Sequence, residues 1–179
     1  MAQTATIYNL KIELADMDRG IYETIELRVA RQPSETPEYM LTRVLAYCLE
    51  YGDGIMLTEG VAAGNDPAIL RKDLTGRVTA WIEVGMPDAD RLHRGSKLAG
   101  RAAVYTHRDV RRLLAIFAAA KIYGAERIPI YSLDPGFVDE LAGLVERRSE
   151  FTLSITEREL FITIGDRNFT TTITEHRIP

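Results

Sequence analysis

The sequence lacks the features of cross-linked, zinc-bound or membrane-inserted proteins. Cysteine occurs once, at Cys48, which excludes an internal disulfide and a cysteine-based zinc site and fits a reducing cytoplasm. The longest apolar run, LLAIFAAA at 113–120, is far shorter than the roughly 20 residues of a membrane helix. The opening MAQTATIYNLKIEL has no basic segment before an apolar block, so no signal peptide is expected. We therefore expect a cytoplasmic protein without a membrane partner.

Several catalytic signatures are also missing. The three histidines, His93, His107 and His176, show no metal-binding spacing, and no P-loop, G-x-S-x-G or G-x-G-x-x-G occurs. The formal charge of −4 argues against a protein that coats nucleic acid non-specifically, because such proteins are usually basic. A local basic face remains compatible with this charge.

The hydrophobic pattern predicts one domain spanning 1–179, of the α/β or α+β class, with a mixed sheet flanked by helices. Strands at 4–14 and 20–31 flank a turn, and Thr36 or Ser34 caps a helix that ends before Gly52. The tail alternates like a meander of two or three strands, with turns at 157–158 and 165–167. The middle predicts further strands at 56–59, 78–86, 102–105 and 128–133, and helices at 88–98, 110–122 and 137–145.

The strand within DLTGRVTAWIEVGMPD, 73–88, contains an unexpected acid. Glu83 shares a strand face with Thr79, Trp81 and Gly85, while Val84 and its alternate neighbours form the apolar face. If both faces are covered, a bare carboxylate there needs a cation or a hydrogen-bond donor. A solvated strand face or a plain ion pair is the simpler explanation of Glu83, and the strand alone favours it.

Asp73 precedes Glu83 by ten residues, with Thr75-Gly76 as a turn between them. A hairpin here is expected to bring both carboxylates to one end of the sheet, where a Mg²⁺ ion relieves their repulsion. The simpler interpretation is that Asp73 is a turn residue chosen for local hydrogen bonding.

Basic residues follow the Glu83 strand at a helical spacing. They are three, three and four residues apart, and a helix reaching that far places them in one stripe: Arg91, Arg94, Lys97 and Arg101. Carboxylates that hold a metal, with cations close behind, suit phosphodiester hydrolysis. A solvated amphipathic helix, with Leu92 and Leu98 inward, gives the same pattern.

The chain resembles the YaeQ family of bacterial proteins over essentially its whole length. The phrases that carry the resemblance occur in fixed order: ATIY, ADMDRG, RQPSETPEYMLTRVLAY, NDPAILRKDLTG and WIEVGMPDADRL. The last two resemble the family's most distinctive block, close to D-E-P-x-L-W-x-x-D-x-T-G followed by W-I-(E/D)-x-G-x-P-D.

This resemblance implies a compact variant of the restriction-endonuclease-like fold of the PD-(D/E)XK nuclease superfamily, with extra N- and C-terminal strands. In that superfamily a helix acid, a hairpin acid and a strand acid hold Mg²⁺. The matching residues are Glu35, Asp73 and Glu83, as ligands for Mg²⁺ or Mn²⁺ and as catalytic groups.

Two departures from the family pattern bear on activity. The superfamily places a lysine two residues after the strand acid, where this chain has Gly85. The family's R-x-x-K-A phrase reads RLHRGS here, so Arg94 takes the lysine position and Lys97 follows one turn later. Arginine stabilises phosphate charge but does not deprotonate readily. The second departure is Asn65-Asp66, where the family pattern is more acidic.

The sequence therefore supports two main hypotheses. The first is a Mg²⁺-dependent nuclease in which Arg94 or Lys97 stabilises the transition state. The second is a nuclease-like fold without chemistry that binds nucleic acid or protein, with Arg91, Arg94, Lys97 and Arg101 as the nucleic-acid contacts. A third, milder interpretation keeps metal binding for stability alone.

Overall fold

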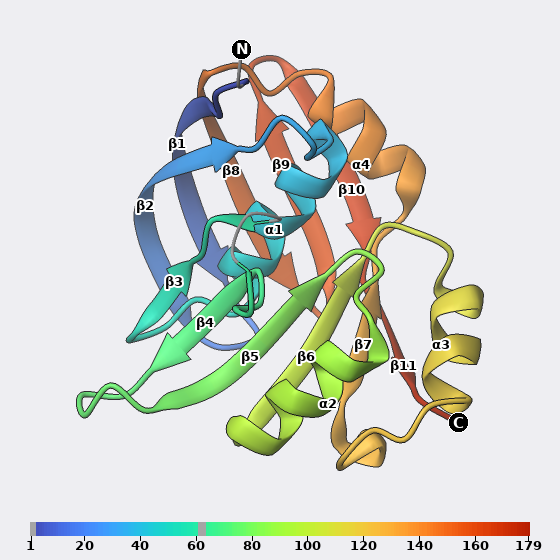
Figure 1. Cartoon of the computed structure of the whole chain (residues 1–179). Helices are drawn as coiled ribbons and strands as arrows, with labels where there is room; N and C mark the ends of the chain where they lie inside the picture. Colours follow the sequence, from blue (N-terminus) through green and yellow to red (C-terminus); the bar gives the residue numbers. More distant parts are fainter. Residues whose placement is uncertain (1–2, 61–63) are drawn as a thin grey trace.

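The chain forms two mixed β-sheets and four α-helices in a computed structural model that describes residues 3–60 and 64–179 (Figure 1). The α+β class is confirmed. The expected mixed pairing is found in two sheets, a five-stranded sheet, β10-β9-β8-β1-β2, and a six-stranded sheet, β11-β7-β6-β5-β4-β3.

The five-stranded sheet combines the two ends of the chain. Strands β1 (Thr6–Asp16) and β2 (Ile21–Arg31) form the predicted antiparallel hairpin. Strand β8 (Arg148–Thr156) runs parallel to β1. It is followed by β9 (Glu159–Ile164) and β10 (Arg167–Thr172), joined by the two predicted turns.

The six-stranded sheet contains the middle of the chain. Strands β5 (Val78–Val84), β6 (Arg101–Thr106) and β7 (Pro129–Ser132) are parallel. Strands β3 (Ile55–Leu57) and β4 (Ile69–Lys72) add antiparallel strands on one side. Strand β11 (Thr174–Arg177) adds one on the other, so the tail has one strand more than the meander predicted.

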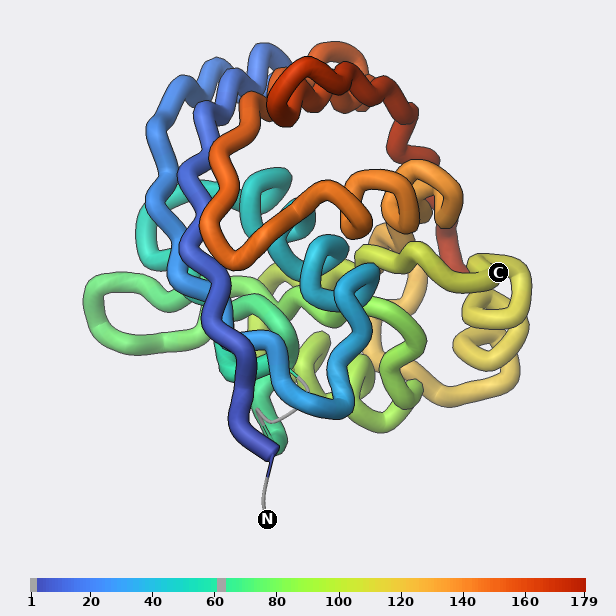
Figure 2. Tube along the Cα trace, turned by 90° about the horizontal axis from the view of Figure 1, so that it is seen from above, coloured from blue at the N-terminus to red at the C-terminus, as the bar shows by residue number. Residues whose placement is uncertain are grey.

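Helix α1 (Pro37–Leu49) lies between the two sheets, and the five-stranded sheet arches over it and over α4 (Figure 2). It starts after Thr36, whose side chain accepts a hydrogen bond from the backbone N–H of Tyr39, so Thr36 rather than Ser34 is the cap. Its stripe of Met40, Leu41, Val44 and Leu45 joins the core beneath the five-stranded sheet, while Ala46 packs on the six-stranded sheet.

Three further α-helices complete the domain. Helices α2 (Ala89–Leu98) and α3 (Val110–Ala118) cover the opposite face of the six-stranded sheet, where Leu92, Leu113 and Phe117 are buried. Helix α3 ends four residues earlier than predicted. Helix α4 (Pro135–Ala142) packs against α1, and a short 3₁₀ turn, η2 (Ala125–Arg127), precedes β7. No helix in the described part of the chain is long and apolar enough to cross a membrane.

Candidate functional site

Glu83 lies near the end of β5 and is 3% exposed, so both faces of this strand are covered. Its Oε1 accepts hydrogen bonds from Trp81 Nε1 at 2.9 Å and from Arg91 Nε at 3.3 Å. Burial raises the pKa of the Glu83 carboxyl, and the Arg91 guanidinium opposes this rise. Of the explanations that the sequence left open, the buried ion pair is the one present.

Arg91 connects three oxygen atoms around its guanidinium group. Besides Glu83, it donates from Nη1 to the carbonyl of Gly64 at 2.8 Å and from Nη2 to the carbonyl of Asp66 at 2.6 Å. These carbonyls precede β4, and the β4–β5 register brings that segment beside the end of β5. Arg91 therefore neutralises Glu83 and ties α2 to the start of β4.

Glu35 is in a second buried ion pair just before α1. Its Oε1 accepts from Arg43 Nε at 2.7 Å, and its Oε2 accepts from the backbone N–H of Gln32 at 3.0 Å. Arg43 is 1% exposed and also donates to the carbonyls of Ala30 and Thr58. Burial raises the pKa of Glu35, and Arg43 offsets part of that rise.

Tyr39 lies close enough to both ion pairs for their charges to shift its pKa. Burial raises the pKa of Tyr39 to about 12; Glu35 and Glu83 raise it, while Arg43 and Arg91 lower it. Its ring also covers Gly85, where an added Cβ would lie 3.1 Å from Tyr39 Cε2. Gly85 has φ +83°, so a lysine at this position would be strained.

Asp73 lies away from these groups. It follows β4 at the exposed tip of the β4–β5 hairpin, where its Oδ1 accepts from the backbone N–H groups of Thr75 and Arg77. The Thr75 hydroxyl also donates to Asp73 Oδ1. This hydrogen bond lowers the pKa of Asp73 most, and the backbone hydrogen bonds lower it further.

The expectation that this hairpin brings Asp73 and Glu83 together is wrong. Lys72 pairs with Val78, so Glu83 lies five residues, or about 16 Å, along β5 from the tip. Asp73 is the turn residue of the simpler interpretation.

Asp73 is thus separated from Glu83, whereas Glu35 and Glu83 both lie close enough to Tyr39 to raise its pKa. Within residues 3–60 and 64–179, no group of three or more His, Cys, Asp or Glu side chains is arranged to hold a metal ion. Glu35 and Glu83 each have an arginine partner instead.

The predicted cationic stripe is divided by the end of α2 at Leu98, since Arg101 is the first residue of β6. Arg91 turns to Glu83. Arg94 is exposed beside Arg91 and adds a smaller lowering of the Glu83 pKa. Lys97 and Arg101 line a pocket at the other end of α2.

This pocket, here called the basic pocket, has a volume of about 390 Å³ and collects cations from four segments. Arg77 comes from the β4–β5 hairpin and Arg127 from η2, neither of which the sequence analysis selected. Only the pairing of β5, β6 and β7 brings them beside Lys97 and Arg101, so no local pattern identifies them.

An aromatic side chain adjoins these cations. Tyr123 lines the basic pocket, is 51% exposed, and has the Arg127 guanidinium 5.7 Å from its ring centroid. Its backbone N–H donates to Nδ1 of His93 at 3.0 Å, which ties this segment to α2.

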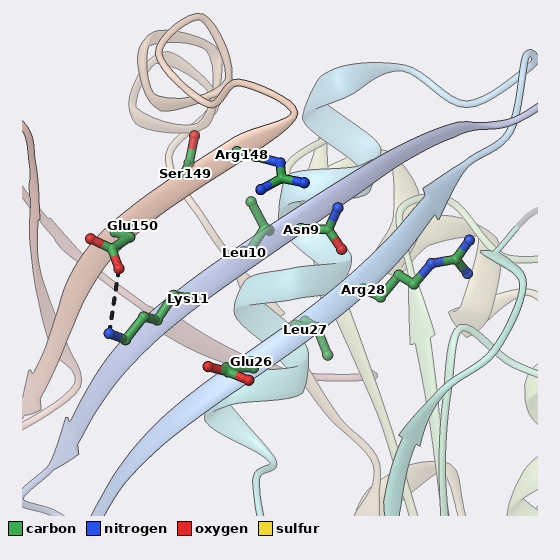
Figure 3. Close-up of a pocket in the computed structure, with 9 residues that line it drawn as sticks. All are labelled: Asn9, Leu10, Lys11, Glu26, Leu27, Arg28, Arg148, Ser149 and Glu150. Carbon is green, nitrogen blue, oxygen red and sulfur yellow. Dashed lines mark ion pairs between the residues drawn. The ribbon is translucent and has the colours of Figure 1, made fainter.

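A separate hollow of about 400 Å³ crosses β2, β1 and β8 on the five-stranded sheet (Figure 3). Lys11 and Glu150 point toward one another there, 3.4 Å apart, and both are well exposed. Glu26, Arg28 and Arg148 complete a set of charges of both signs. The hollow contains none of the predicted site residues and has the character of a solvated sheet face.

Comparison with known proteins agrees with the predicted family. The family model described as YaeQ protein matches residues 1–173. The chain belongs to the YaeQ family. It is 29% identical over 184 residues to an uncharacterised YaeQ protein of Escherichia coli strain K12, covering 100% of this chain and 99% of that protein.

Two crystal structures of YaeQ proteins share the fold. The Pseudomonas syringae structure has a TM-score of 0.90 and 32% identity, with 97% of each chain covered. The structure from Xanthomonas axonopodis pv. citri has a TM-score of 0.88 and 28% identity, covering 98% of this chain and 100% of that one.

Proposed function

We propose that this YaeQ protein binds nucleic acid and that the basic pocket contacts the phosphates. The observation that carries the proposal is the convergence of Arg77, Lys97, Arg101 and Arg127 on one pocket with an exposed tyrosine. Proteins that bind single strands combine a cationic groove with aromatic rings on which bases stack.

The charges of this pocket are largely available to a ligand. In the described part of the chain, Arg77 and Lys97 have no carboxylate within salt-bridge distance. Arg127 has only the exposed Glu126 at 3.7 Å, a kind of pair that is worth little in water. Arg101 is neutralised by Glu50, and its hydrogen bonds to Glu50 raise the pKa of Arg101. We therefore assign Arg101 a positioning role.

Arg94 extends this surface toward the buried acids. It lies one helical turn before Lys97 on the exposed side of α2. A nucleic-acid strand that is bound at the basic pocket and follows α2 would pass Arg94 and reach the end of β5.

The test is binding of a labelled single-stranded oligonucleotide, by fluorescence anisotropy over a range of salt concentrations. Arg77→Gln/Lys97→Gln/Arg127→Gln should weaken binding at least tenfold. It should also reduce the slope of log K against log salt by about 2, from three phosphate contacts at about 0.7 each. A duplex and an RNA of the same sequence would show which strand state is preferred.

A matched control is available on the other sheet. Lys11→Gln/Arg28→Gln/Arg148→Gln removes the same charge from the five-stranded sheet and should leave the slope unchanged. Equal effects from both triple variants, or a wild-type protein that binds no oligonucleotide, would reject the proposed surface.

The second candidate is metal-dependent phosphodiester hydrolysis, as the PD-(D/E)XK resemblance implies. It is favoured by the position of Arg91, whose guanidinium is surrounded by one carboxylate and two carbonyl oxygens. Hard divalent cations prefer such ligands, and a bound Mg²⁺ lowers the pKa of its water. Hydrolysis would require the Arg91 guanidinium to move away from these oxygen atoms, so that the metal ion can take its place.

Calorimetric titration with Mn²⁺ separates the two candidates. A latent metal site predicts saturable binding by Arg91→Ala, loss of that binding in Arg91→Ala/Glu83→Gln, and no effect of adding Asp73→Ala. If Arg91→Ala binds no Mn²⁺, metal-dependent hydrolysis is rejected and nucleic-acid binding is the remaining candidate function.

A further inference from the structure

A second pocket, here called the seam pocket, lies between the two sheets near the C-terminal end of α1. Its volume is about 360 Å³. Arg19 comes from the β1–β2 turn and Arg158 from the β8–β9 turn, while Arg71 and Arg101 come from β4 and β6. Four guanidinium groups that are distant in sequence therefore line one small cavity.

The carboxylates of the seam pocket are already bound within the protein. Glu50 accepts from Arg101 at 2.6 and 3.0 Å and from the Tyr105 hydroxyl at 2.7 Å. Asp16 accepts from Arg19 Nε at 2.6 Å, and Asp18 accepts from two backbone N–H groups. These acids have little capacity left to bind a cationic ligand.

Three of the four arginines form ion pairs, Arg19 with Asp16, Arg101 with Glu50 and Arg158 with Glu175, and Arg71 differs from them. Among residues 3–60 and 64–179, the buried Nε of Arg71 finds no hydrogen-bond partner, although buried N–H groups are normally paired. Its Nη2 donates to the carbonyl of Glu50, and no carboxylate of the described residues forms an ion pair with it. An acceptor-rich ligand would satisfy this donor.

A strained turn places Arg158 at the same pocket. Glu157 and Arg158 form the two-residue turn between β8 and β9 with φ +51° and +64°, a conformation that favours glycine or asparagine. Asp18 holds the turn through the backbone N–H groups of both residues, at 2.7 and 3.1 Å. The Arg158 guanidinium then lies 5.6 Å from the ring centroid of Tyr131. Such strain is commonly kept at functional sites.

We propose that the seam pocket binds a small molecule carrying a phosphate group, of up to mononucleotide size. Arginine is well suited to bind phosphate, and the unpaired Nε–H of Arg71 supplies the first contact. Arg158 closes the pocket from the other sheet. A volume of about 360 Å³ is within the usual range for small-molecule sites.

This proposal goes beyond nucleic-acid binding and is separable from it. The seam pocket and the basic pocket share Arg101, but Arg71 and Arg158 line only the former, and Lys97 and Arg127 only the latter. Variants of one pocket therefore leave the other intact.

Calorimetric titration of the full chain with inorganic phosphate, 5′-AMP and adenosine is the test. Phosphate and 5′-AMP should bind and adenosine should not. Arg71→Gln and Arg158→Gly should each weaken 5′-AMP binding at least tenfold. Arg158→Gly will fold, because glycine adopts the left-handed conformation without strain. Arg71→Lys keeps the charge without the planar fork and should also bind more weakly than wild type.

Three results would overturn the proposal. One is adenosine binding as well as 5′-AMP, which would remove the role of the phosphate. Another is no binding of phosphate or 5′-AMP at concentrations up to about 10 mM. The third is 5′-AMP binding that Lys97→Gln/Arg127→Gln abolishes and Arg71→Gln does not, which would assign it to the basic pocket.

Discussion

Among individual residues, the buried glutamates of this protein are all stabilised in the same way, by an arginine partner. Glu35, Glu50 and Glu83 are each at most 6% exposed, and each accepts a hydrogen bond from an arginine. A buried carboxylate without a partner would take up a proton or destabilise the fold. An acid inside an apolar run therefore predicts a cation, and in this chain the cation is a guanidinium group.

Arg43→Met should be among the most destabilising single substitutions, since it leaves Glu35 buried and unpaired. We expect a loss of about 3–5 kcal/mol at neutral pH in urea unfolding. The double variant Glu35→Gln/Arg43→Met should recover part of this loss.

The same loss should depend on pH. Burial already raises the folded-state pKa of Glu35 above its ordinary 4.5, and removing Arg43 raises it further. A raised pKa means that the folded state binds the proton more tightly, so this contribution is present at low pH and is lost as pH rises through the folded-state pKa. The Arg43→Met penalty should shrink below about pH 5. An equal loss of stability in Arg43→Met at neutral pH and below about pH 5, measured by urea unfolding, would contradict the ion-pair explanation.

At the element scale, α2 is positioned by direct contact with the tryptophan of β5. A Cβ added to Gly95 would lie 2.3 Å from Trp81 Cδ1, so the helix backbone rests on the indole. The indole N–H in turn donates to Glu83. The placement of Arg91, Arg94 and Lys97 therefore depends on a glycine that the charge pattern gives no reason to select.

Gly95→Ala should destabilise the protein although alanine is the better helix former. Overpacking typically costs about 1–3 kcal/mol, against about 1 kcal/mol gained in helix propensity. Urea unfolding and a shift in Trp81 fluorescence would measure the effect. Gly100→Ala is the control, because its nearest atom, the Thr79 carbonyl oxygen, is 4.0 Å away. Similar stability of both variants would show that α2 adjusts freely.

At the scale of the whole molecule, the two sheets are joined by shared packing. Helix α1 is buried between them, and Tyr47, Leu49, Leu57 and Tyr131 pack against the cores of both. The chain also passes from β10 in one sheet to β11 in the other. The core beneath the five-stranded sheet includes α1, although the six-stranded sheet has a further core under α2 and α3.

This shared packing predicts that residues 1–179 unfold as one domain. Trp81 fluorescence reports the six-stranded sheet, and far-ultraviolet circular dichroism reports both sheets and the helices. The two signals should change together in urea, with one midpoint. Two separated transitions would show that the sheets are independent units.

Local pattern was sufficient for most elements and for the family. Alternation in β1 and β2, the Thr36 cap with its apolar stripe and the paired turns of the tail are properties of adjacent residues. The motif order that resembles YaeQ is likewise contained in the chain. These features depend on backbone conformation and side-chain periodicity, which sequence expresses directly.

Which charged side chains meet depends on the pairing of strands that are distant in sequence. The sheet register separates Asp73 from Glu83, although a hairpin joins them in sequence. The parallel pairing of β5, β6 and β7 collects Arg77, Lys97, Arg101 and Arg127, and the meeting of the two sheets collects Arg19, Arg71 and Arg158. The sequence alone determined that the chain is an α+β domain with acids needing partners. The pairing of distant strands determined the partners, because register and sheet order depend on contacts between residues far apart in the chain.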